Sequence, residues 1–497
     1  MKKIFYENDN LTNLEGCTLI YGHFSTIHPG HIRYINHAKS KSKKVVVALL
    51  GDDNKTQKKF EFKQKDRAHS LEILPIIDYV VCLKNNDLKN IINRIKPSYL
   101  ILGTEFKNSL DNKVNEAIKI QKIANRIVEF HAGEINYAST DLFNNSEFDL
   151  SSKRKKQFIL ACNQQGLSKD HLLKSINDWK ETNILVIGDA ILDQYSACEP
   201  LGISAEAPVV VVKELENKNF IGGAAIVSSH IRALGCKCDL LSVIGDDQNG
   251  EIIRKDIEQK NINGGLFVDS SRPTTFKKRY MVENQKLFRV SKLDERPISQ
   301  EIEDKLINKI EELAPHSNCI VISDFVYGVV TEKIIKKVKE ISKKHSIPLL
   351  GDIQCSSQIG SLMKFSDFTL LCPNEREARI ALQDNHSGIE KVSREIIKKL
   401  KIKGLIMKLG PNGFISYDCF NTTNTTRQAF PALTANPLDV AGAGDSLMAI
   451  MASGLACNHK IMTSSALACC MAAISVSNMG NIPIRYDKLI DFLNSLL

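Results

Sequence analysis

Close to the C-terminus, a run of small residues ends in an acid and is followed by an apolar segment. The run is Asp439-Val440-Ala441-Gly442-Ala443-Gly444-Asp445, and the segment after it has the composition of a buried helix. Backbone N–H groups at the start of such a helix bind phosphate oxygens, and glycines let a phosphate approach the backbone. A carboxylate there can accept the proton of an attacking hydroxyl. The run therefore predicts phosphoryl transfer with Asp445 as the general base.

A second motif suited to phosphate chemistry follows the first predicted strand. It reads Gly22-His23-Phe24-Ser25-Thr26-Ile27-His28-Pro29-Gly30-His31. A helix that begins here offers N–H groups to phosphate, Gly30 permits close approach, and His28 and His31 can donate to oxygens on a phosphorus under attack. Two surface histidines in a turn are the alternative interpretation. The joint spacing of the glycines, Phe24 and the histidines after a strand favours the catalytic one.

The elements around these motifs alternate between strand and helix patterns. In the first half, β-branched runs predict strands at 17–22, 45–50, 79–83, 100–103 and 127–130, with helices at 32–39, 66–73 and 88–95. In the second half, strands are predicted at 184–187, 240–244, 319–322, 348–352, 369–371 and 405–408. This alternation is typical of α/β folds with parallel sheets.

Two further features of the sequence are a boundary between domains and a pair of segments that alternate like exposed strands. A polar, basic stretch at 144–156 and a helical connector at 157–179 separate the halves. We therefore predict domains at 1–143 and 181–497, joined by 144–180, and expect proteolysis near Arg154–Lys156 to yield two active parts. Segments 207–212 and 275–290 alternate like exposed antiparallel strands, which predicts a small β lid and a homodimer formed through it.

Composition excludes several classes of protein. The 497 residues are 43% hydrophobic and 25% charged, which suits two to four globular domains. The charge of +9 comes from 66 Lys+Arg against 57 Asp+Glu, spread over lysine-rich helices, so no nucleic-acid partner is expected. The thirteen cysteines follow no disulfide or metal spacing, which favours a reducing cytoplasm. No signal peptide is expected, and the most apolar stretches, 446–457 and 464–477, are too short to span a membrane.

The N-terminal motif resembles the signature of the cytidylyltransferase-like nucleotidyltransferases, and the similarity extends over most of residues 15–142. It implies a Rossmann-like domain. Arg67 matches an arginine that helps to hold the nucleotide, and one of Lys55, Lys58 and Lys59 matches a phosphate-contacting lysine, with Lys58 as our candidate. The resemblance implies catalysis by His28 and His31. It assigns the nucleotide to Gly22, Phe24, Gly30, Lys58, Arg67, Ser139 and Thr140.

The C-terminal motif resembles the signature of ribokinase-type (PfkB) carbohydrate kinases, which implies a ribokinase-like α/β domain. Asn374-x-x-Glu377 resembles the family's magnesium and phosphate motif, with Glu377 acting indirectly on Mg²⁺, and Gly410-x-x-Gly413 resembles its nucleotide loop. The resemblance assigns nucleotide and phosphate binding to Asn374, Glu377, Gly410, Gly413, Gly442, Ala443 and Gly444. It assigns sugar binding to Gly222 and Gly223.

The subfamily most similar in detail is the heptose-phosphate kinase of lipopolysaccharide precursor synthesis. The segments Gly188-Asp189-Ala-Ile-Leu-Asp193 and Ile203-Ser204-Ala-Glu206 carry this resemblance, together with Lys277 and Arg279, and add Asp193, Lys277 and Arg279 to the sugar site. That family joins a kinase and a nucleotidyltransferase in one chain, here in reversed order. The resemblance implies ATP-dependent phosphorylation of a sugar or sugar phosphate such as heptose 7-phosphate. It also implies transfer of a nucleotidyl group from ATP or CTP to a sugar 1-phosphate, as in ADP-heptose synthesis, with Mg²⁺.

Three positions depart from these families. Ser25 stands where an Asp is usual, Ile226 replaces the Asn after Gly-Gly-Ala-Ala, and Lys408 replaces a Thr that often begins the nucleotide loop. These changes indicate a divergent subgroup and leave the identity of the sugar open. The alternatives are another sugar or polyol phosphate as substrate, or a ligand-binding protein whose sites have decayed.

Overall fold

The computed structural model divides the chain into two compact units. Unit 1 is Met1–Ser146 with Leu382–Glu395, and unit 2 is Glu147–Ala381 with Ile396–Leu497. The structure describes residues 3–24, 27, 29–42, 44–52, 62–84, 86–103, 106, 112–131, 147–283, 285–354, 361–420 and 425–497. Among the described residues, no helix combines the length and apolar character that crossing a bilayer requires.

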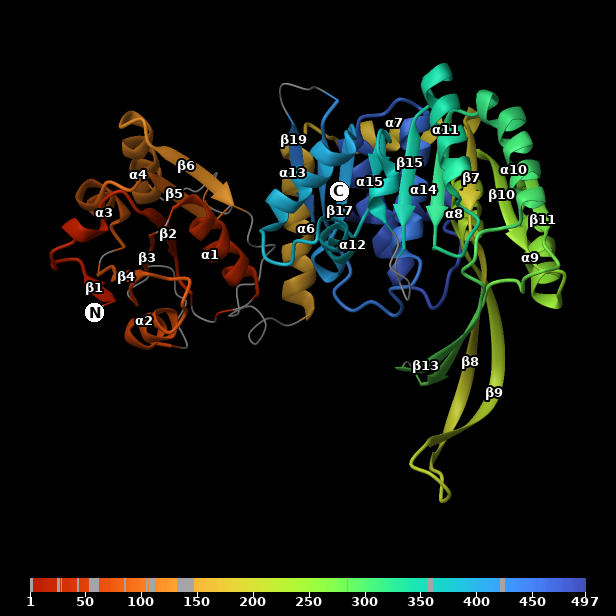
Figure 1. The fold of residues 1–497 in the computed structure, drawn as a ribbon, viewed down its shortest axis with the longest axis horizontal. Coiled ribbons are helices and arrows are strands. Elements are labelled where there is room, and N and C mark those ends of the chain that lie inside the picture. The colour runs from red at the N-terminus through yellow and green to blue at the C-terminus, as the bar shows by residue number, and fades with distance from the viewer. Residues whose placement is uncertain are drawn as a thin grey trace. The chain divides into compact units, whose positions relative to one another are not determined.

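Unit 1 is built on a parallel sheet in the order β1-β4-β3-β2-β5-β6 (Figure 1). Its strands are β1 (Ile4–Tyr6), β2 (Thr18–Gly22), β3 (Val45–Leu49), β4 (Tyr79–Cys82), β5 (Tyr99–Gly103) and β6 (Ile127–His131). The described helices are α1 (Pro29–Lys41), α2 (Gln64–Glu72), α3 (Leu88–Ile95) and α4 (Asn112–Ile123). Buried residues of α1 and α2 pack on one face of the sheet, and those of α3 and α4 pack on the other. The predicted Rossmann-like arrangement is confirmed.

Unit 2 contains a larger sheet in the order β11-β10-β7-β14-β15-β16-β17-β18-β19. Its strands are β7 (Asn183–Gly188), β10 (Lys237–Ile244), β11 (Asn263–Val268), β14 (Cys319–Asp324), β15 (Leu349–Ile353), β16 (Leu370–Leu371), β17 (Gly404–Lys408), β18 (Phe414–Asp418) and β19 (Thr426–Phe430). The pairs are parallel from β11 to β17 and antiparallel from β17 to β19. The parallel part brings the carboxyl ends of its strands to one edge, where ligands of α/β sheets bind.

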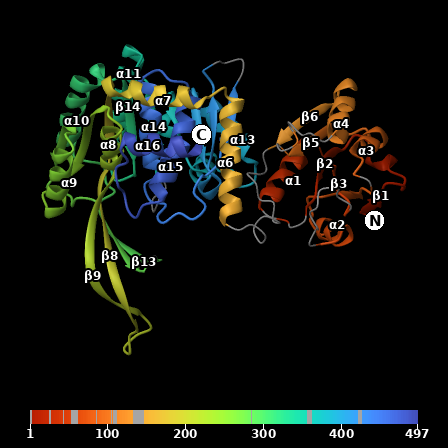
Figure 2. The same cartoon turned by 180° about the vertical axis from the view of Figure 1, so that it is seen from behind.

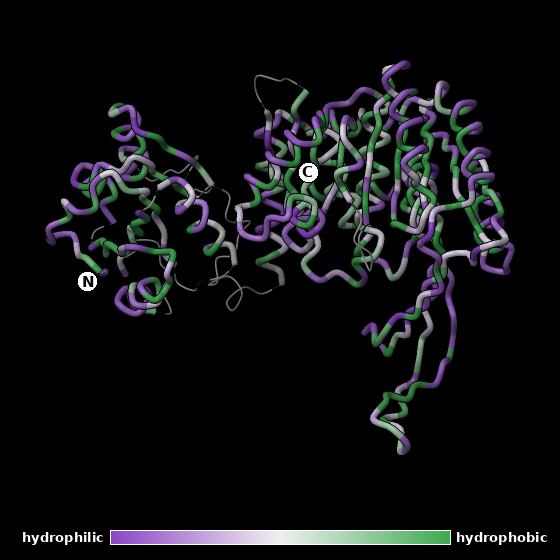
Figure 3. Tube along the Cα trace, in the orientation of Figure 1, coloured by the Kyte–Doolittle hydropathy of each residue, from purple (hydrophilic) through white to green (hydrophobic). Residues whose placement is uncertain are grey.

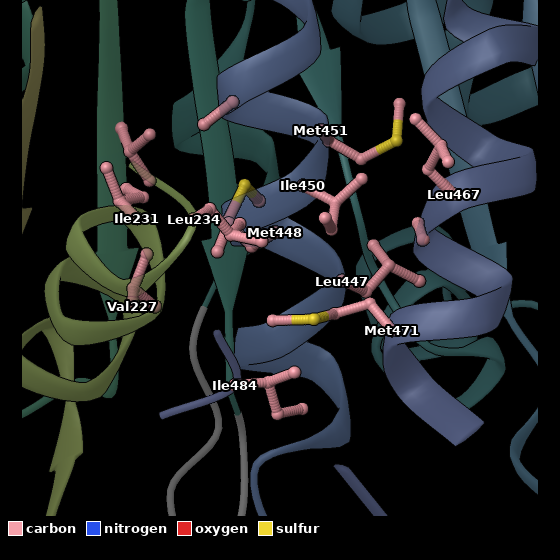
Figure 4. Packing of buried hydrophobic residues seen from close by; sticks show 14 of the residues in the cluster. Val227, Ile231, Leu234, Leu447, Met448, Ile450, Met451, Leu467, Met471 and Ile484 are labelled. Carbon is pink, nitrogen blue, oxygen red and sulfur yellow. The ribbon is translucent and has the colours of Figure 1, made fainter. Parts of the chain in front are cut away.

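Helices cover both faces of this sheet (Figures 1 and 2). On one side lie α8 (Ala224–Ala233), α14 (Ala443–Ala456), α15 (Ile461–Val476) and α16 (Tyr486–Leu496); elsewhere lie α9 (Gln248–Gln259), α10 (Gln300–Leu313), α11 (Glu332–His345) and α12 (Glu375–Leu382). The division into units cuts α13 (Ile389–Leu400) after Glu395. The centre of the core is aliphatic: Met448 of α14 lies on the side of Val227 and Ile231 of α8, and Leu447 lies toward Met471 of α15 (Figure 4). Because α14 is buried along its whole length, its N-terminus is held firmly at the carboxyl edge of the sheet.

A second, four-stranded sheet extends from this core in the order β13-β12-β8-β9. Its strands are β8 (Ala190–Ile203), β9 (Val210–Gly223), β12 (Phe276–Val282) and β13 (Gln285–Lys292). The predicted lid segments 207–212 and 275–290 fall on β9, β12 and β13. Sequence alternation missed β8 because Asp193 and Tyr195 are buried on the strand beside apolar neighbours, which hides the two-residue period.

The connector between the halves differs from the expected pattern. It contains two helices, α6 (Glu147–Gln164) and α7 (Lys169–Asn177), and the first begins within the polar stretch predicted at 144–156 rather than after it. Gly166, at φ +65°, ends the first, and the Ser168 side chain caps the second by accepting from His171 N at 3.2 Å. The basic stretch that resembled a loop already belongs to α6, since Lys, Arg and Gln favour helices. Arg154 donates to the carbonyls of Thr434 and Pro411.

Because α6 contains Arg154–Lys156, we now expect the two parts of the chain to be separable before residue 147 rather than within this stretch. We predict that a fragment of residues 147–497 folds cooperatively, whereas a fragment of residues 181–497 unfolds at a lower temperature or aggregates. The longer fragment retains Phe158, Leu172 and Trp179, all of which are fully buried against unit 2, and each large side chain contributes roughly 1.5–3 kcal/mol. Circular dichroism melting of the two fragments measures the difference. Equal melting temperatures would show that α6 and α7 are not part of this core.

Candidate active sites

The centre of the unit 2 site is a buried carboxyl group in the first turn of α14. Asp445 is 5% exposed, and its Oδ1 accepts from Gln354 Nε2 at 2.9 Å. Burial raises the pKa of Asp445 to about 7, the neighbouring Asp352 adds to the rise, and Lys408 opposes it. A carboxyl group with such a pKa is suited to take a proton from a hydroxyl near neutral pH.

The helix that carries Asp445 begins in a left-handed turn. Gly442, the N-cap of α14, has φ +79°, and a Cβ there would lie 2.3 Å from Asn481 Oδ1. Only glycine fits this backbone without strain. The turn leaves the N–H groups of the predicted Ala443 and Gly444 at the start of the helix, as an anion site requires.

A buried ion pair lies beside this turn. Both carboxylate oxygens of Asp352, at the end of β15, accept from Lys408 Nζ, at 2.8 and 3.0 Å. Lys408 is the last residue of β17, and its main chain forms a parallel bridge with the predicted Asn374. Asn374 and Glu377 cap α12 reciprocally: Glu377 Oε2 accepts from Asn374 N at 2.7 Å, and Asn374 Oδ1 accepts from Glu377 N at 2.9 Å.

The predicted nucleotide loop follows Lys408 directly. Gly410 and Gly413 have φ values of +57° and +84°, and Gly413 N donates to Gly410 O at 3.0 Å. The loop therefore forms a tight turn at the same edge of the sheet as the start of α14. Sequence analysis placed these two glycine motifs in one site, and Lys408 lies beside both, since it precedes the turn in the chain and its Nζ would lie 3.3 Å from a Cβ built on Gly444.

On the other side of Asp445 lie the residues predicted to bind sugar. Asp193 of β8 is buried, pairs with Arg279 of β12, and accepts from Asn481 Nδ2 at 3.2 Å. Gly222 and Gly223 end β9 opposite these strands, and Gly223 adopts φ +63°, where a Cβ would lie 2.1 Å from Asp189 O. The di-glycine thus lets β9 turn into α8 against the strand that carries Asp193.

Lys277 of β12 has an unusual environment. It is 3% exposed, and its Nζ lies 5.2 Å from the ring centre of Phe325 and 5.0 Å from that of Tyr327. No carboxylate or carbonyl of the described residues accepts a hydrogen bond from this ammonium. Its charge also lowers the pKa of Asp445, so the ammonium lies near the reacting group as well as over the two rings. A buried cation with these neighbours is suited to bind an anion that arrives with a ligand.

Ile226, the departure from the family's Asn, does not face this site. Its side chain is fully buried in the core of α8. The change from Asn to Ile is therefore accommodated by packing, and the structure offers Asn481 as a buried amide beside Asp193 instead.

In unit 1, the start of α1 follows β2 as predicted. Phe24 is buried with φ +48°, and its ring lies 4.9 Å from that of His31 and 6.4 Å from that of Tyr34. Gly22 ends β2, where a Cβ would lie 3.1 Å from the Phe24 ring. His31 is half-buried in the first turns of α1, close to the N–H groups at its start. Gly30 lies in the same helix, whereas His28, Lys58, Ser139, Thr140 and Ser25 lie outside the described residues.

Arg67, which the resemblance assigns to the nucleotide, is a buried side chain of α2. It is 2% exposed and donates to the carbonyls of His23, Leu50 and Phe62. It also pairs with Asp52, at 2.7 Å. Its guanidinium therefore joins the loops that follow β2 and β3, and it shapes the backbone around the histidine motif.

Comparison with known proteins places these geometries in families. The model of the pfkB family carbohydrate kinases matches residues 181–486, which is more than half of the chain. The chain belongs to the pfkB family. The cytidylyltransferase-like family model matches residues 19–194, which agrees with the predicted resemblance of the N-terminal part.

Relatives and solved structures agree with this assignment. The chain is 34% identical over 317 residues to the Bifunctional protein HldE of Campylobacter jejuni, a match that covers 63% of this chain and 65% of that protein. It is 30% identical over 311 residues to the Bifunctional protein HldE of Trichlorobacter lovleyi, with 62% of each chain covered. Phosphofructokinase-2 from Escherichia coli superposes with a TM-score of 0.53 at 18% identity, over 63% of this chain and 99% of that one, which shows the ribokinase-like fold.

The pfkB kinase site contains residues that sequence analysis did not select. Asp352, Gln354 and Asn481 lie around Asp445 and Asp193, but only Asp352 carried a signal, as an acid at the carboxyl end of a predicted strand. Asp439 was quoted in the glycine motif without a role. It accepts from Tyr195 Oη at 2.7 Å and Lys286 Nζ at 2.6 Å, which ties β8 and β13 to the turn before α14.

We predict that Asp445→Asn lowers sugar phosphorylation by about 10²–10⁴-fold, because the amide cannot take the hydroxyl proton. Since the raised pKa of Asp445 is about 7, the wild-type kcat/KM should fall as the pH drops below about 7, where the carboxyl group becomes protonated. Steady-state ADP release from pH 5.5 to 9 measures both effects.

As a matched variant in the other unit, His31→Ala should spare phosphorylation and lower nucleotidyl transfer by about 10²–10³-fold. Loss of both activities in either variant would show that the two sites are not independent.

Proposed function

We propose that this chain is a bifunctional enzyme of nucleotide-activated sugar synthesis. Unit 2 phosphorylates a sugar or sugar phosphate with ATP, and unit 1 transfers a nucleotidyl group from ATP or CTP to a sugar 1-phosphate and releases pyrophosphate. The observation that carries the first activity is Asp445, a buried carboxyl group with a pKa of about 7 at the start of α14. The relatives named Bifunctional protein HldE support the pairing of two activities.

The kinase step follows from the positions of the charged groups. A sugar hydroxyl gives its proton to Asp445 and attacks the γ-phosphorus, while the bond to the β–γ bridging oxygen breaks and ADP leaves. The N–H groups of Ala443 and Gly444 hold the phosphoryl oxygens, and Asp193 accepts from another hydroxyl of the sugar. Arg279 pairs with Asp193 and fixes the position of its carboxylate.

Magnesium enters this scheme together with ATP. Among the described residues, no group of three or more His, Cys, Asp or Glu side chains is arranged to hold a metal by itself. This fits Mg²⁺, which keeps several waters and is usually bound through nucleotide phosphates and one or two carboxylates. Glu377, at the capped start of α12, is the carboxylate we assign to it, acting through water. The ion would neutralise phosphate charge there.

Lys277 supports a sugar that already carries a phosphate, such as a heptose 7-phosphate. Its ammonium is buried over two rings and lies close enough to Asp445 to lower the pKa of that group, and no described carboxylate accepts a hydrogen bond from it, so an anionic group of the substrate can be its hydrogen-bond acceptor. If the substrate enters phosphorylated, the product carries two phosphates. A separate phosphatase must then act before unit 1 can use a sugar 1-phosphate.

In unit 1, the sugar phosphate attacks the α-phosphorus of the nucleotide directly, and pyrophosphate leaves. His28 and His31 donate to the oxygens on which charge develops, and no covalent enzyme intermediate is needed. Arg67 acts as a positioning residue, because its donors hold the loops around the histidine motif. For the nucleotide base that unit 1 selects, adenine and cytosine are the two alternatives.

The partner of the lid is a second copy of the chain. Ile203 is 75% exposed and Val210 61% exposed near the tip of the β8–β9 ribbon, where hydrophobic residues gather (Figure 3). Leu201 and Leu215 are also exposed on the same strands. Such a patch on a protruding sheet is rarely left in water, and two ribbons can cover each other.

We predict that Lys277→Met raises KM for a phosphorylated sugar by roughly 10–100-fold, the loss expected for a charge-assisted hydrogen bond. The KM for the same sugar without phosphate should change little. Lys278→Met is the matched control, because Lys278 is the next residue of β12 and pairs with Glu214 away from the rings. ADP release and product mass over a panel of sugars, sugar phosphates and glycerol phosphate measure the effect. An equal loss for both forms of the sugar would assign Lys277 to packing, and activity on glycerol phosphate alone would favour a polyol substrate.

We predict that the wild-type chain is a dimer and that Ile203→Glu with Val210→Glu makes it monomeric without changing its melting temperature by more than a few degrees. Light scattering coupled to size exclusion measures the mass. Val268→Glu is the control, since Val268 is exposed at the far edge of the main sheet. A wild-type monomer, or a double variant that stays dimeric, would contradict the lid interface.

A further inference from the structure

Lys408 stands where three predicted phosphate elements meet. It ends β17, its main chain bridges Asn374, and the turn of Gly410 and Gly413 follows it in the chain. Its side chain is only 16% exposed and is held by both oxygens of Asp352. The side chain therefore has one defined position at the carboxyl edge of the sheet.

That position is beside the N-terminal end of α14. A Cβ built on Gly444 would lie 3.3 Å from Lys408 Nζ and 3.8 Å from Asp352 Oδ2. The N-terminus of a helix carries partial positive charge, so a second cation beside it is unfavourable unless an anion lies between them. Asp352 supplies part of that negative charge. In the proposed kinase reaction, the phosphoryl oxygens lie on the side of Lys408 that faces the glycine turn.

The ammonium keeps its charge there. Burial lowers the pKa of Lys408, but the carboxylates of Asp352 and Glu377 raise it more, so the group stays protonated. An ammonium has three N–H donors, and the two oxygens of Asp352 accept from it. A further donor is thus available to a ligand, which a threonine at this position could not supply with a positive charge.

We propose that Lys408 is a catalytic residue of the kinase step: its ammonium donates to a non-bridging oxygen of the γ-phosphate and stabilises the transferring phosphoryl group. This rests on the proposed kinase function. Asp352 is its positioning residue. In the step, the sugar oxygen bonds to the γ-phosphorus, the β–γ bridging bond breaks, and the hydroxyl proton goes to Asp445. Lys408 keeps all its protons throughout and shifts only its hydrogen bond.

The test compares Lys408→Met, Lys408→Arg and the double variant Asp352→Asn/Lys408→Met. We expect Lys408→Met to lower kcat by about 10²–10³-fold with little change in the KM of the sugar, and Lys408→Arg to recover part of the loss. The double variant removes the buried charge that the methionine leaves unpaired, so it should fold like the wild type but remain as slow as Lys408→Met. A double variant that regains the wild-type kcat would overturn the proposal, because Lys408 would then serve only to neutralise Asp352. Wild-type kcat in Lys408→Met would overturn it as well.

Binding separates this inference from the kinase function itself. Calorimetry with a non-hydrolysable ATP analogue and with ADP, both with Mg²⁺, should show Lys408→Met weakening the triphosphate at least tenfold and ADP much less. Lys403→Met, at the other end of β17, is the control and should bind both as the wild type does. If the wild type phosphorylates no sugar yet shows this selective loss, the kinase function fails and the phosphate contact stands. Equal weakening of both nucleotides would overturn the γ-phosphate contact.

Discussion

The placement of buried cations around three buried carboxyl groups is the constraint on which the kinase site depends. Lys408 pairs with Asp352 and Arg279 pairs with Asp193, whereas Asp445 receives a neutral amide from Gln354. An ion pair keeps a buried carboxylate charged, but burial without a cation raises the pKa of a carboxyl group. Burial and the neighbouring Asp352 raise the pKa of Asp445 to about 7 although Lys408 and Lys277 oppose the rise, so Asp445 is the group that can exchange a proton near neutral pH. The chemistry depends on this acid, whose side chain is hydrogen-bonded to an amide rather than to a cation.

The same region joins the lid to the glycine turn. Asp439, just before the turn, accepts from Tyr195 of β8 and Lys286 of β13, and Gly480 N donates to it at 3.2 Å. Asn481, the next residue, reaches from Asp193 to the turn at Gly442. A loop between α15 and α16, remote in the sequence from both motifs, thus links the sugar side of the site to the phosphate side. These hydrogen bonds would transmit a movement of the lid to the N-terminal end of α14.

Unit 1 uses a similar principle with a single side chain. Arg67 is buried and gives its hydrogen bonds to Asp52 and to three carbonyls, one just after β2 and two in the connection between β3 and α2. Buried carbonyls need donors, and one guanidinium with five N–H groups can satisfy several at once. The carbonyl of His23, the residue after β2, is thus held by a charged side chain from α2.

Much of this protein was determined by the sequence alone. The strand and helix periods predicted the α/β fold, because buried parallel strands must be apolar, and most predicted strands coincide with observed ones within a residue or two. Local motifs identified Asp445, Gly442 and the start of α1, since a helix N-terminus that binds phosphate needs small residues in consecutive positions. The connector showed the limit of this approach: a basic stretch resembles a loop, but Arg154 and its neighbours form a helix whose packing on unit 2 only the structure reveals.

Only the tertiary structure decided which charges meet. Asp352, Lys408, Gln354 and Asn481 come from different strands and loops, and nothing in their local sequence marks them as neighbours of Asp445. Lys408 looked like a departure from a family pattern until its partner Asp352 was seen, and Ile226 looked like a lost contact until its side chain was seen in the core. The physical reason is that local sequence reports backbone preference and burial, whereas a pKa or an ion pair depends on distances between residues far apart in the chain. Those distances are set by strand order and register, which the folded sheet alone determines.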